Sequence, residues 1–277
     1  FNAKSPYVFE GVEVRPEGAI EWKEFDCIVS HAPNLRNHVR FLRRTERKKV
    51  ALFFHGHEVL RRKEYPAPYR WNKQRPLKSI ATSVYDAIKL KALKIWISRL
   101  SRENKIGLIF VSKWMEDRFD ANINIEAQNS KISRIVIPNA VNEVFLIKTY
   151  DQDAEKIADF VTIRPLDDSK YSIDIVTQLA ATNPSKTFHV YGVGEYFRRN
   201  KAPRNLTWFD TFIGQSEIPS LLVRYRYALM PTRFDAQGVM VCEMATYGIP
   251  TLTSDIEVCK EMLDGFSNCD FVLSSAT

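Results

Sequence analysis

Two acidic residues, Asp235 and Glu243, stand eight positions apart around the start of an expected helix. An apolar run ends at Met230, an irregular stretch follows, and Gly238 opens a helix that Gly248 closes. Loops after the strands of open α/β sheets bind ligands, and the free N–H groups of a helix N-terminus attract phosphate. Two carboxylates there can accept hydrogen bonds from two hydroxyl-bearing parts of one extended ligand. The pattern predicts a site for a phosphate or a sugar.

Three further residues at strand ends could take part in chemistry. Arg164 directly follows the apolar run 160–163, and Lys170 follows six residues later. His55 ends the run 50–54, and a histidine at such a place is either a site residue or a satisfied structural group. The D-x-D pattern at 151–153 has no strand beside it and indicates a solvated linker, so we expect no metal site.

The elements that must position these residues alternate along the chain. Short, nearly continuous apolar runs predict buried parallel strands at 27–30, 50–54, 108–112, 135–137, 160–163, 188–191, 228–230 and 251–253. Helical patterns separate them at 84–103, 113–119, 172–182, 216–226, 239–247 and 257–263. Such alternation favours parallel α/β sheets. A polar stretch divides the chain, and we expect two lobes, 1–145 and 146–277.

Charge is distributed unevenly between the two halves. Residues 1–138 hold 27 Lys and Arg against 15 Asp and Glu, whereas residues 139–277 hold 13 against 18. A nucleic acid, an anionic membrane surface or a phosphorylated substrate could each explain the basic half. Segment 61–78 is expected to be a long exposed loop. In the helix 84–103 we expect Val84, Ile88, Leu93, Trp96 and Leu100 to share one face, with most of the basic residues elsewhere.

Cysteine usage and the ends of the chain add two expectations. The four cysteines have no zinc spacing, and we expect buried free thiols in a reducing cytosol. No apolar run is long enough to span a bilayer. The chain starts with neither an initiator methionine nor a signal peptide, which suggests part of a longer protein.

The stretch from Leu229 to Asp255 resembles the E-x7-E signature of the retaining GT-B glycosyltransferases of the group 1, GT4-like family. Asp235 stands where the family has Glu, which shortens the contact to the donor sugar by one methylene group. Other stretches resemble family landmarks in the expected order: 53–58, 111–115, 137–142, 162–170, 190–195 and 205–214. The resemblance spans residues 26 to about 262.

The resemblance implies two Rossmann-like lobes that face each other across a cleft, and a role for each matching residue. Asp235 would bind the donor sugar, Glu243 the ribose, and Arg164 and Lys170 the diphosphate. His55 would line the cleft near the reacting centre. The remaining residues that we assign to donor binding are Gln237, Gly238, Val239, Gly192, Gly194 and Asn139.

The function implied is transfer of a sugar from a nucleoside diphosphate donor, UDP-sugar first, to a glycan or lipid-linked acceptor, with retention of configuration and no cofactor or metal. We expect a cytoplasmic enzyme of bacterial cell-surface polysaccharide or glycoprotein synthesis, peripheral at the inner face of the cell membrane. One alternative is a nucleotide-sugar epimerase or hydrolase of the same fold. The others are a catalytically silent subunit, or a protein that binds nucleic acid or an anionic surface through residues 36–49 and 61–78. The basic stretches lack interleaved aromatics, which disfavours nucleic acid.

Overall fold

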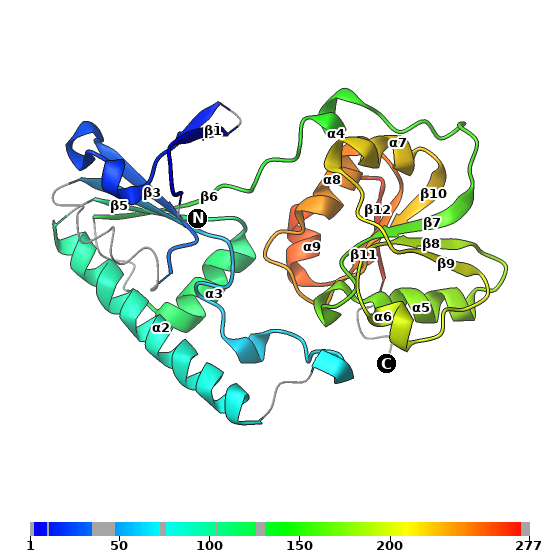
Figure 1. Ribbon diagram of the computed structural model, residues 1–277, viewed down its shortest axis with the longest axis horizontal. Helices are drawn as coiled ribbons and strands as arrows, with labels where there is room; N and C mark the ends of the chain where they lie inside the picture. Colours follow the sequence, from blue (N-terminus) through cyan, green and yellow to red (C-terminus); the bar gives the residue numbers. More distant parts are fainter. Residues whose placement is uncertain are drawn as a thin grey trace.

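The computed structural model describes residues 3–9, 11–34, 48–72, 76–103, 105–125 and 131–272, and these form two lobes, each built on a parallel sheet. Figure 1 shows the lobes side by side, joined above by one chain segment and approached below by a second one. Parallel α/β sheets in two lobes are what the alternating strand and helix patterns predict.

The N-terminal lobe has a four-stranded sheet in the order β3-β4-β5-β6. The strands are β3 (Cys27–His31), β4 (Lys49–Phe54), β5 (Ile106–Phe110) and β6 (Ile132–Val136). Two helices, α2 (Pro76–Glu103) and α3 (Lys113–Ile123), lie on one side of this sheet (Figure 1). Alternate side chains of β4 point into a core where the rings of Phe54, Phe110 and Phe119 contact one another.

The opposite face of this sheet is partly open to solvent. Val29 is 53% exposed and Ile135 is 55% exposed. The segment before β3 forms a hairpin of β1 (Tyr7–Phe9) and β2 (Val12–Val14), followed by two short 3-10 helices, η1 (Glu17–Ala19) and η2 (Trp22–Glu24). Cys27 is exposed, so the expectation that it is buried was wrong. The reason is its position on this open face, because neighbouring residues of a strand point to opposite sides.

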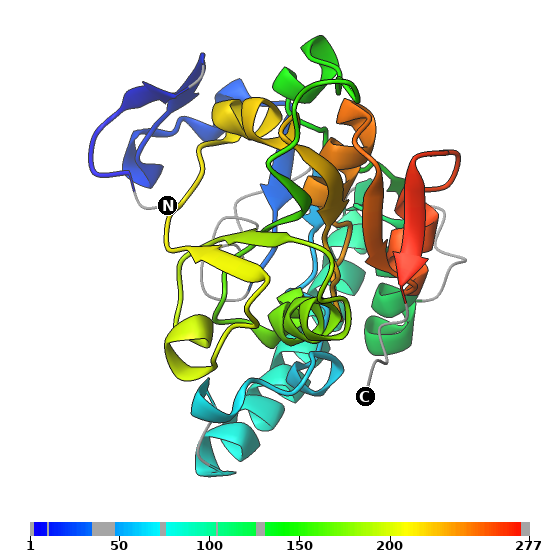
Figure 2. The same cartoon turned by 90° about the vertical axis from the view of Figure 1, so that its right-hand side faces the viewer.

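The C-terminal lobe has a six-stranded parallel sheet in the order β12-β11-β10-β7-β8-β9. Its strands are β7 (Ala158–Ile163), β8 (Phe188–Tyr191), β9 (Leu206–Phe209), β10 (Tyr225–Leu229), β11 (Thr251–Ser254) and β12 (Cys269–Val272). Helices cover both faces (Figures 1 and 2). They are α4 (Val144–Ile147), η5 (Ser169–Tyr171), α5 (Ile173–Thr182), α6 (Tyr196–Arg199), η6 (Gln215–Glu217), α7 (Ile218–Leu222), α8 (Val239–Tyr247) and α9 (Glu257–Met262). The expected helix 216–226 ends at Leu222, because β10 begins at Tyr225.

The lobes meet at a linker, residues 137–143, between β6 and α4. Phe145, which follows the linker, belongs to the core of the C-terminal lobe. Across the lobes, the carboxylate of Glu261 in α9 accepts hydrogen bonds from the backbone N–H groups of Lys113 (2.5 Å) and Trp114 (2.9 Å). An α9 residue therefore caps the N-terminus of α3 from the other lobe.

Segment 61–72 also crosses from the N-terminal lobe to the C-terminal lobe, and we call it the strap. It contains η3 (Arg62–Glu64) and η4 (Arg70–Asn72). Within the strap, the hydroxyl of Tyr69 donates to Asp174 (3.1 Å), and the amide of Asn72 donates to the carbonyl of Asp167 (2.8 Å). The prediction of a long exposed loop over 61–78 was wrong, because aromatic side chains hold the strap on the other lobe and α2 begins at Pro76.

The helix expected at 84–103 begins earlier, at Pro76, and its apolar residues are divided between two faces. Leu93 and Leu100 are buried in the core, and Trp96 packs partly against it. Val84 and Ile88 are instead 54% and 58% exposed, so the expected single apolar face was wrong. The five positions do not all lie within one side of a 3.6-residue period, and the buried polar pair Asp86 and Lys89 completes the inner face.

Removing the Glu261 carboxylate should weaken the contact between the lobes. We expect Glu261→Ala to lower the free energy of unfolding by about 1–2 kcal/mol, because two N–H groups at the start of α3 lose their acceptor. Chemical denaturation measured by circular dichroism checks this, with Glu155→Ala, which changes an exposed carboxylate away from α3, as the control. An unchanged unfolding midpoint for Glu261→Ala would contradict the capping role.

Candidate functional site

The strand order of the C-terminal sheet reverses at β7, which pairs with β8 on one side and with β10 on the other. Such a reversal opens a crevice at the carboxyl ends of the strands, where open α/β sheets bind ligands. A hollow of about 600 Å³, called the main pocket here, lies at that place. It is lined by Ile163, Arg164, Pro165, Lys170, Tyr171, Tyr191, Gly192, Val193, Thr211, Phe212, Ile213, Gln215, Ile218, Asp235, Val239, Met240 and Glu243.

Arg164 stands in the main pocket directly after β7, where its charge is buried. Its exposed fraction is 6%, and among the described residues its Nε and Nη2 atoms have no hydrogen-bond partner. Burial lowers the pKa of its guanidinium, and the nearby carboxylate of Asp235 raises it. Buried donors without acceptors are unfavourable in a protein interior. Arg164 lines the main pocket, so its positive charge can act on an anion bound there.

A second cation lies beside Arg164, and an aromatic ring lies against both. The guanidinium of Arg164 is 5.1 Å from the ring centre of Tyr171, and the Nζ atom of Lys170 is 4.6 Å from it. Cations are attracted to the faces of aromatic rings at such distances. Nothing in the sequence predicted that Tyr171 would contact both basic side chains.

Gly192 lets the ends of β7 and β8 approach closely. A Cβ atom at Gly192 would lie 1.9 Å from the carbonyl oxygen of Arg164, so no other residue fits without moving the backbone. Gly192 lines the main pocket, whereas Gly194 lies outside its lining and packs against Asp167. The two expected donor-binding glycines therefore occupy different positions relative to the pocket.

Asp235 is placed by the loop between β10 and α8. Its Oδ1 atom accepts hydrogen bonds from the N–H groups of Ala236 (2.8 Å) and Gln237 (3.3 Å), which fix the turn. Gly238 has a φ of +73° and is the N-cap of α8, a conformation that favours glycine. Asp235 and Val239 both line the main pocket, and the N-terminus of α8 opens beside them.

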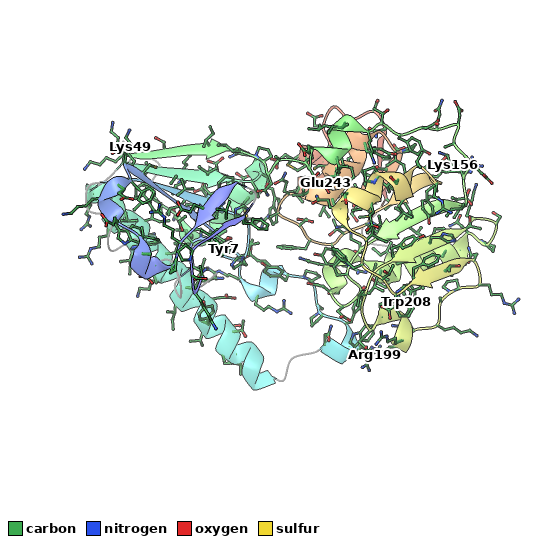
Figure 3. The ribbon with its side chains drawn as sticks, turned by 45° about the horizontal axis from the view of Figure 1, so that its top comes forward. Tyr7, Lys49, Lys156, Arg199, Trp208 and Glu243 are labelled. Carbon is green, nitrogen blue, oxygen red and sulfur yellow. The ribbon has the colours of Figure 1, made fainter. Side chains whose placement is uncertain are left out.

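Glu243 is the second carboxylate of the main pocket and is 2% exposed. Its Oε1 atom accepts hydrogen bonds from the N–H group of Asn142 (3.2 Å) and from the Nε2 atom of Gln215 (2.7 Å). Burial raises the pKa of this carboxyl, and the two hydrogen bonds lower it. Figure 3 shows Glu243 at the side of the C-terminal lobe that is turned toward the N-terminal lobe.

Asn139 and Gln237, both expected to bind the donor, are paired with each other. The Oε1 atom of Gln237 accepts from the backbone N (2.8 Å) and the Nδ2 atom (2.6 Å) of Asn139, and its Nε2 atom donates to the Asn139 carbonyl (2.8 Å). Neither residue lines the main pocket. Three hydrogen bonds thus tie the linker to the loop that carries Asp235.

One end of the main pocket is apolar. Tyr191 and Ile218 form its inner part, while Phe212 stands at the rim with 84% of its surface exposed. A large exposed aromatic ring beside an apolar hollow suits stacking on a flat ligand group. Phe212 and Gln215 line the main pocket but were not predicted from the sequence. Phe212 lies in segment 205–214, one of the stretches that resemble family landmarks.

A second, smaller hollow of about 330 Å³ lies on the other side of Asp235 and is called the side pocket here. Trp114 comes from α3 of the N-terminal lobe, and its ring meets that of Phe234 edge-on at 5.5 Å. The lining of the side pocket is Trp114, Arg233, Phe234, Asp235, Asp255, Ile256, Glu257 and Val258. Aromatic rings with carboxylates nearby can hold a sugar, which has apolar C–H faces and hydroxyl edges.

His55 lies at the end of β4 but lines neither pocket. Its Nε2 atom is 3.2 Å from the Nδ1 atom of His31, and its ring stacks on Phe53. The neighbouring Gly56 faces the loop after Asp235, since a Cβ atom there would lie 3.6 Å from the side chain of Ala236. Burial lowers the pKa of His55, which favours a neutral ring at pH 7.

The acidic pairs outside the pockets form local turns. The N–H group of Asp153 donates to the side chain of Asp151, and Asp168 caps the N–H group of Lys170. Asp167 accepts a hydrogen bond from the N–H group of Glu195. In the part of the chain that the structure describes, no three His, Cys, Asp or Glu side chains form a group that could hold a metal ion.

Comparison with known proteins shows the fold. The sequence matches no protein-family model and no curated protein. Among solved structures, the chain is similar to that of a GtfA/B complex, with a TM-score of 0.59 at 13% identity over 99% of this chain. It is also similar to the pneumococcal O-GlcNAc transferase GtfA in complex with UDP and GlcNAc, with a TM-score of 0.55 at 12% identity over 91% of the chain. A third similar structure is the sucrose-phosphate synthase from Thermosynechococcus elongatus, with a TM-score of 0.58 at 14% identity over 84% of the chain.

These neighbours are glycosyltransferases, and the two-lobe arrangement with parallel sheets is the GT-B fold, as the sequence predicted. The chain spans 52% of the chain matched in the GtfA/B complex, 48% of GtfA and 57% of the synthase, which is about half of each. At these identities the similarity establishes the fold alone.

The histidine pair allows a test of the geometry at the end of β4. The pKa of His55 is lowered first by burial, and the charge of His31 lowers it further, so His31→Gln should raise this pKa. NMR titration of the imidazole protons measures it, and His189→Gln in the other lobe is the control. In the folded chain the pKa of His55 lies below its ordinary value of 6.5. As the pH falls below 6.5, the unfolded chain therefore binds this proton more readily than the folded chain, and the free energy of unfolding decreases. If the titration midpoint of His55 falls or stays the same in His31→Gln, the contact between His55 and His31 is contradicted.

Proposed function

We propose that this chain transfers a sugar from a nucleoside diphosphate donor, a UDP-sugar first, to a hydroxyl group of a glycan or lipid-linked acceptor. The observation that carries the proposal is the buried Arg164, which lines the main pocket together with Lys170 and two carboxylates. A nucleoside diphosphate sugar has a doubly charged diphosphate between two hydroxyl-bearing rings. The main pocket offers cations and carboxylates in a single hollow of a size typical for small-molecule sites.

Transfer requires the diphosphate to leave as positive charge develops on the sugar. Arg164, Lys170 and the N-terminus of α8 would stabilise the negative charge that grows on the leaving phosphate. Their positions are set by the folded chain, so little reorganisation accompanies the reaction. These cations can supply the charge that a divalent metal ion supplies in other transferases, and our proposal includes transfer without a metal.

The two carboxylates would hold the two rings of the donor. Glu243 would accept hydrogen bonds from the ribose hydroxyls, and Asp235, at the wall between the pockets, would accept them from the sugar. The apolar end near Phe212 would take the base. The structural neighbour GtfA binds UDP and GlcNAc, which supports UDP as the first nucleotide to test. Retention of configuration is proposed from the resemblance of the segment around Asp235 to retaining enzymes.

The acceptor would enter through the side pocket. This pocket shares Asp235 with the main pocket and takes Trp114 from the N-terminal lobe, so an acceptor there would touch both lobes. His55 lies at a strand end beside the loop that carries Asp235. We propose that its neutral ring meets the sugar or the acceptor when the lobes close, which would also exclude water.

The first test is a calorimetric titration with UDP, GDP and ADP. We expect UDP to bind, and Glu243→Gln to weaken its binding roughly 10- to 100-fold, because hydrogen bonds from the ribose to a charged carboxylate are lost. A glutamine can still accept from Asn142 and Gln215. Since burial penalises the ionised Glu243 in the folded state, the melting temperature at pH 7 should stay the same or rise.

The control for this titration is Glu155→Gln, which changes an exposed carboxylate outside the pocket and should leave UDP binding unchanged. Failure of all three nucleotides to bind the folded chain would refute the donor site. Equal binding by wild type and Glu243→Gln would refute the role of Glu243 alone.

The side pocket is tested by turnover. We expect Trp114→Ala to raise the KM for the acceptor roughly tenfold and to leave the Kd for UDP unchanged, because Trp114 lines the side pocket only. Release of UDP from UDP-sugars, measured with and without a panel of glycosides, gives the acceptor KM, and the calorimetric titration gives the Kd for UDP. A Trp114→Ala enzyme with an unchanged acceptor KM would contradict this placement. Donor turnover that needs no acceptor would identify a hydrolase or an epimerase instead.

A further inference from the structure

The outer face of α2 is apolar and open to solvent. Ile80, Val84, Ile88 and Ile95 are each between 54% and 63% exposed. The first three are spaced by four residues, and Ile95 follows seven residues after Ile88, so all four lie along one side of the helix. Figure 1 shows α2 at the outer edge of the N-terminal lobe, with its other side against the sheet.

The same outer face carries positive charge without negative charge. Lys91, Lys94, Arg99 and Arg102 are exposed on α2. The only acidic residue between Ile80 and Arg102 is Asp86, which is buried and binds Lys89. Surface helices of proteins in water ordinarily mix both signs of charge and place their apolar residues toward the core. The outer face of α2 therefore carries a net positive charge beside a row of exposed apolar side chains.

A lipid surface with anionic headgroups matches both properties. Branched aliphatic side chains can enter the boundary between headgroups and acyl chains, while lysine and arginine meet the phosphates. A nucleic acid would use the basic residues but would leave the aliphatic stripe in water. No helix in the described part of the chain is long and apolar enough to cross a membrane, which agrees with α2 lying along the surface.

We propose that the outer face of α2 docks this protein on an anionic membrane surface. The proposal is independent of the donor site, because none of the α2 residues lines either pocket. Ile80 to Arg102 spans roughly 33 Å of helix at 1.5 Å per residue, so several headgroups can be contacted together. The N-terminal lobe would then lie on the membrane through α2.

The test is co-sedimentation with vesicles of 30% phosphatidylglycerol in phosphatidylcholine, compared with pure phosphatidylcholine. We expect binding to the anionic vesicles and at least tenfold weaker binding to the neutral ones. Val84→Glu with Ile88→Glu should reduce binding at least tenfold, because both side chains are exposed and would carry charge into the interface. Lys91→Glu with Lys94→Glu should do the same, since each basic residue near such a surface contributes about fivefold.

The matched control is Leu146→Glu with Ile147→Glu, which changes two exposed apolar residues of α4 in the other lobe and should leave vesicle binding unchanged. Circular dichroism of each variant shows that it is folded. Equal sedimentation of wild type and both α2 variants would overturn the proposal, and so would absence of binding to anionic vesicles. Binding of a duplex oligonucleotide that depends on Lys91 and Lys94, with no vesicle binding, would assign the surface to nucleic acid instead.

Discussion

The positive charge of Arg164, buried at the point where the C-terminal sheet reverses its strand order, is the constraint on which the site depends. Its carbonyl lies so close to Gly192 that a side chain at that position would push the ends of β7 and β8 apart. The ring of Tyr171 lies beside the guanidinium, and the carboxylate of Asp235 raises its pKa. The Nε and Nη2 atoms have no hydrogen-bond partner among the described residues, so the neighbouring groups hold this guanidinium without satisfying all of its donors.

Contacts between the lobes complete the site from outside the C-terminal sheet. The pair of Asn139 and Gln237 fixes the loop that carries Asp235 to the linker, and Asn142 fixes Glu243 to the same linker. Both pocket carboxylates are thus held with respect to the segment about which the lobes would turn. The strap adds a second attachment between the lobes. The hydroxyl of its Tyr69 donates to Asp174, and Arg233 donates to the same carboxylate. Together with the cap that Glu261 gives to α3, the linker and the strap set the spacing of the lobes at three places.

Sequence reasoning predicted the sheets and the four charged residues that line the main pocket, because both depend on local patterns. Apolar runs mark the strands, and Arg164, Lys170, Asp235 and Glu243 follow strand ends or open a helix, so they converge without any knowledge of the other lobe. What it did not predict depends on contacts between distant segments. The crossing of the strap, the pairing of Gln237 with Asn139 and the cap that Glu261 gives to α3 join residues about 100 or more positions apart. The exposure of Val84 is different, because the 3.6-residue period already places it on the side of α2 opposite Leu93. Residues 36–49, which we considered for nucleic acid, fall largely outside the described part of the chain, since 35–47 lie beyond it.

The bonds between the linker and the loop that carries Asp235 bear on how proteins of this fold could be recombined. A chimera that joins this N-terminal lobe to a C-terminal lobe of different origin would separate Asn139 from Gln237 and the start of α3 from Glu261. Each lobe has a buried core of its own. The loop with Asp235 would nevertheless lose its anchor, and the main pocket of the hybrid would have one loosely held wall. Exchange of N-terminal lobes between proteins of this fold therefore has to carry the linker and its partners along as one inherited block.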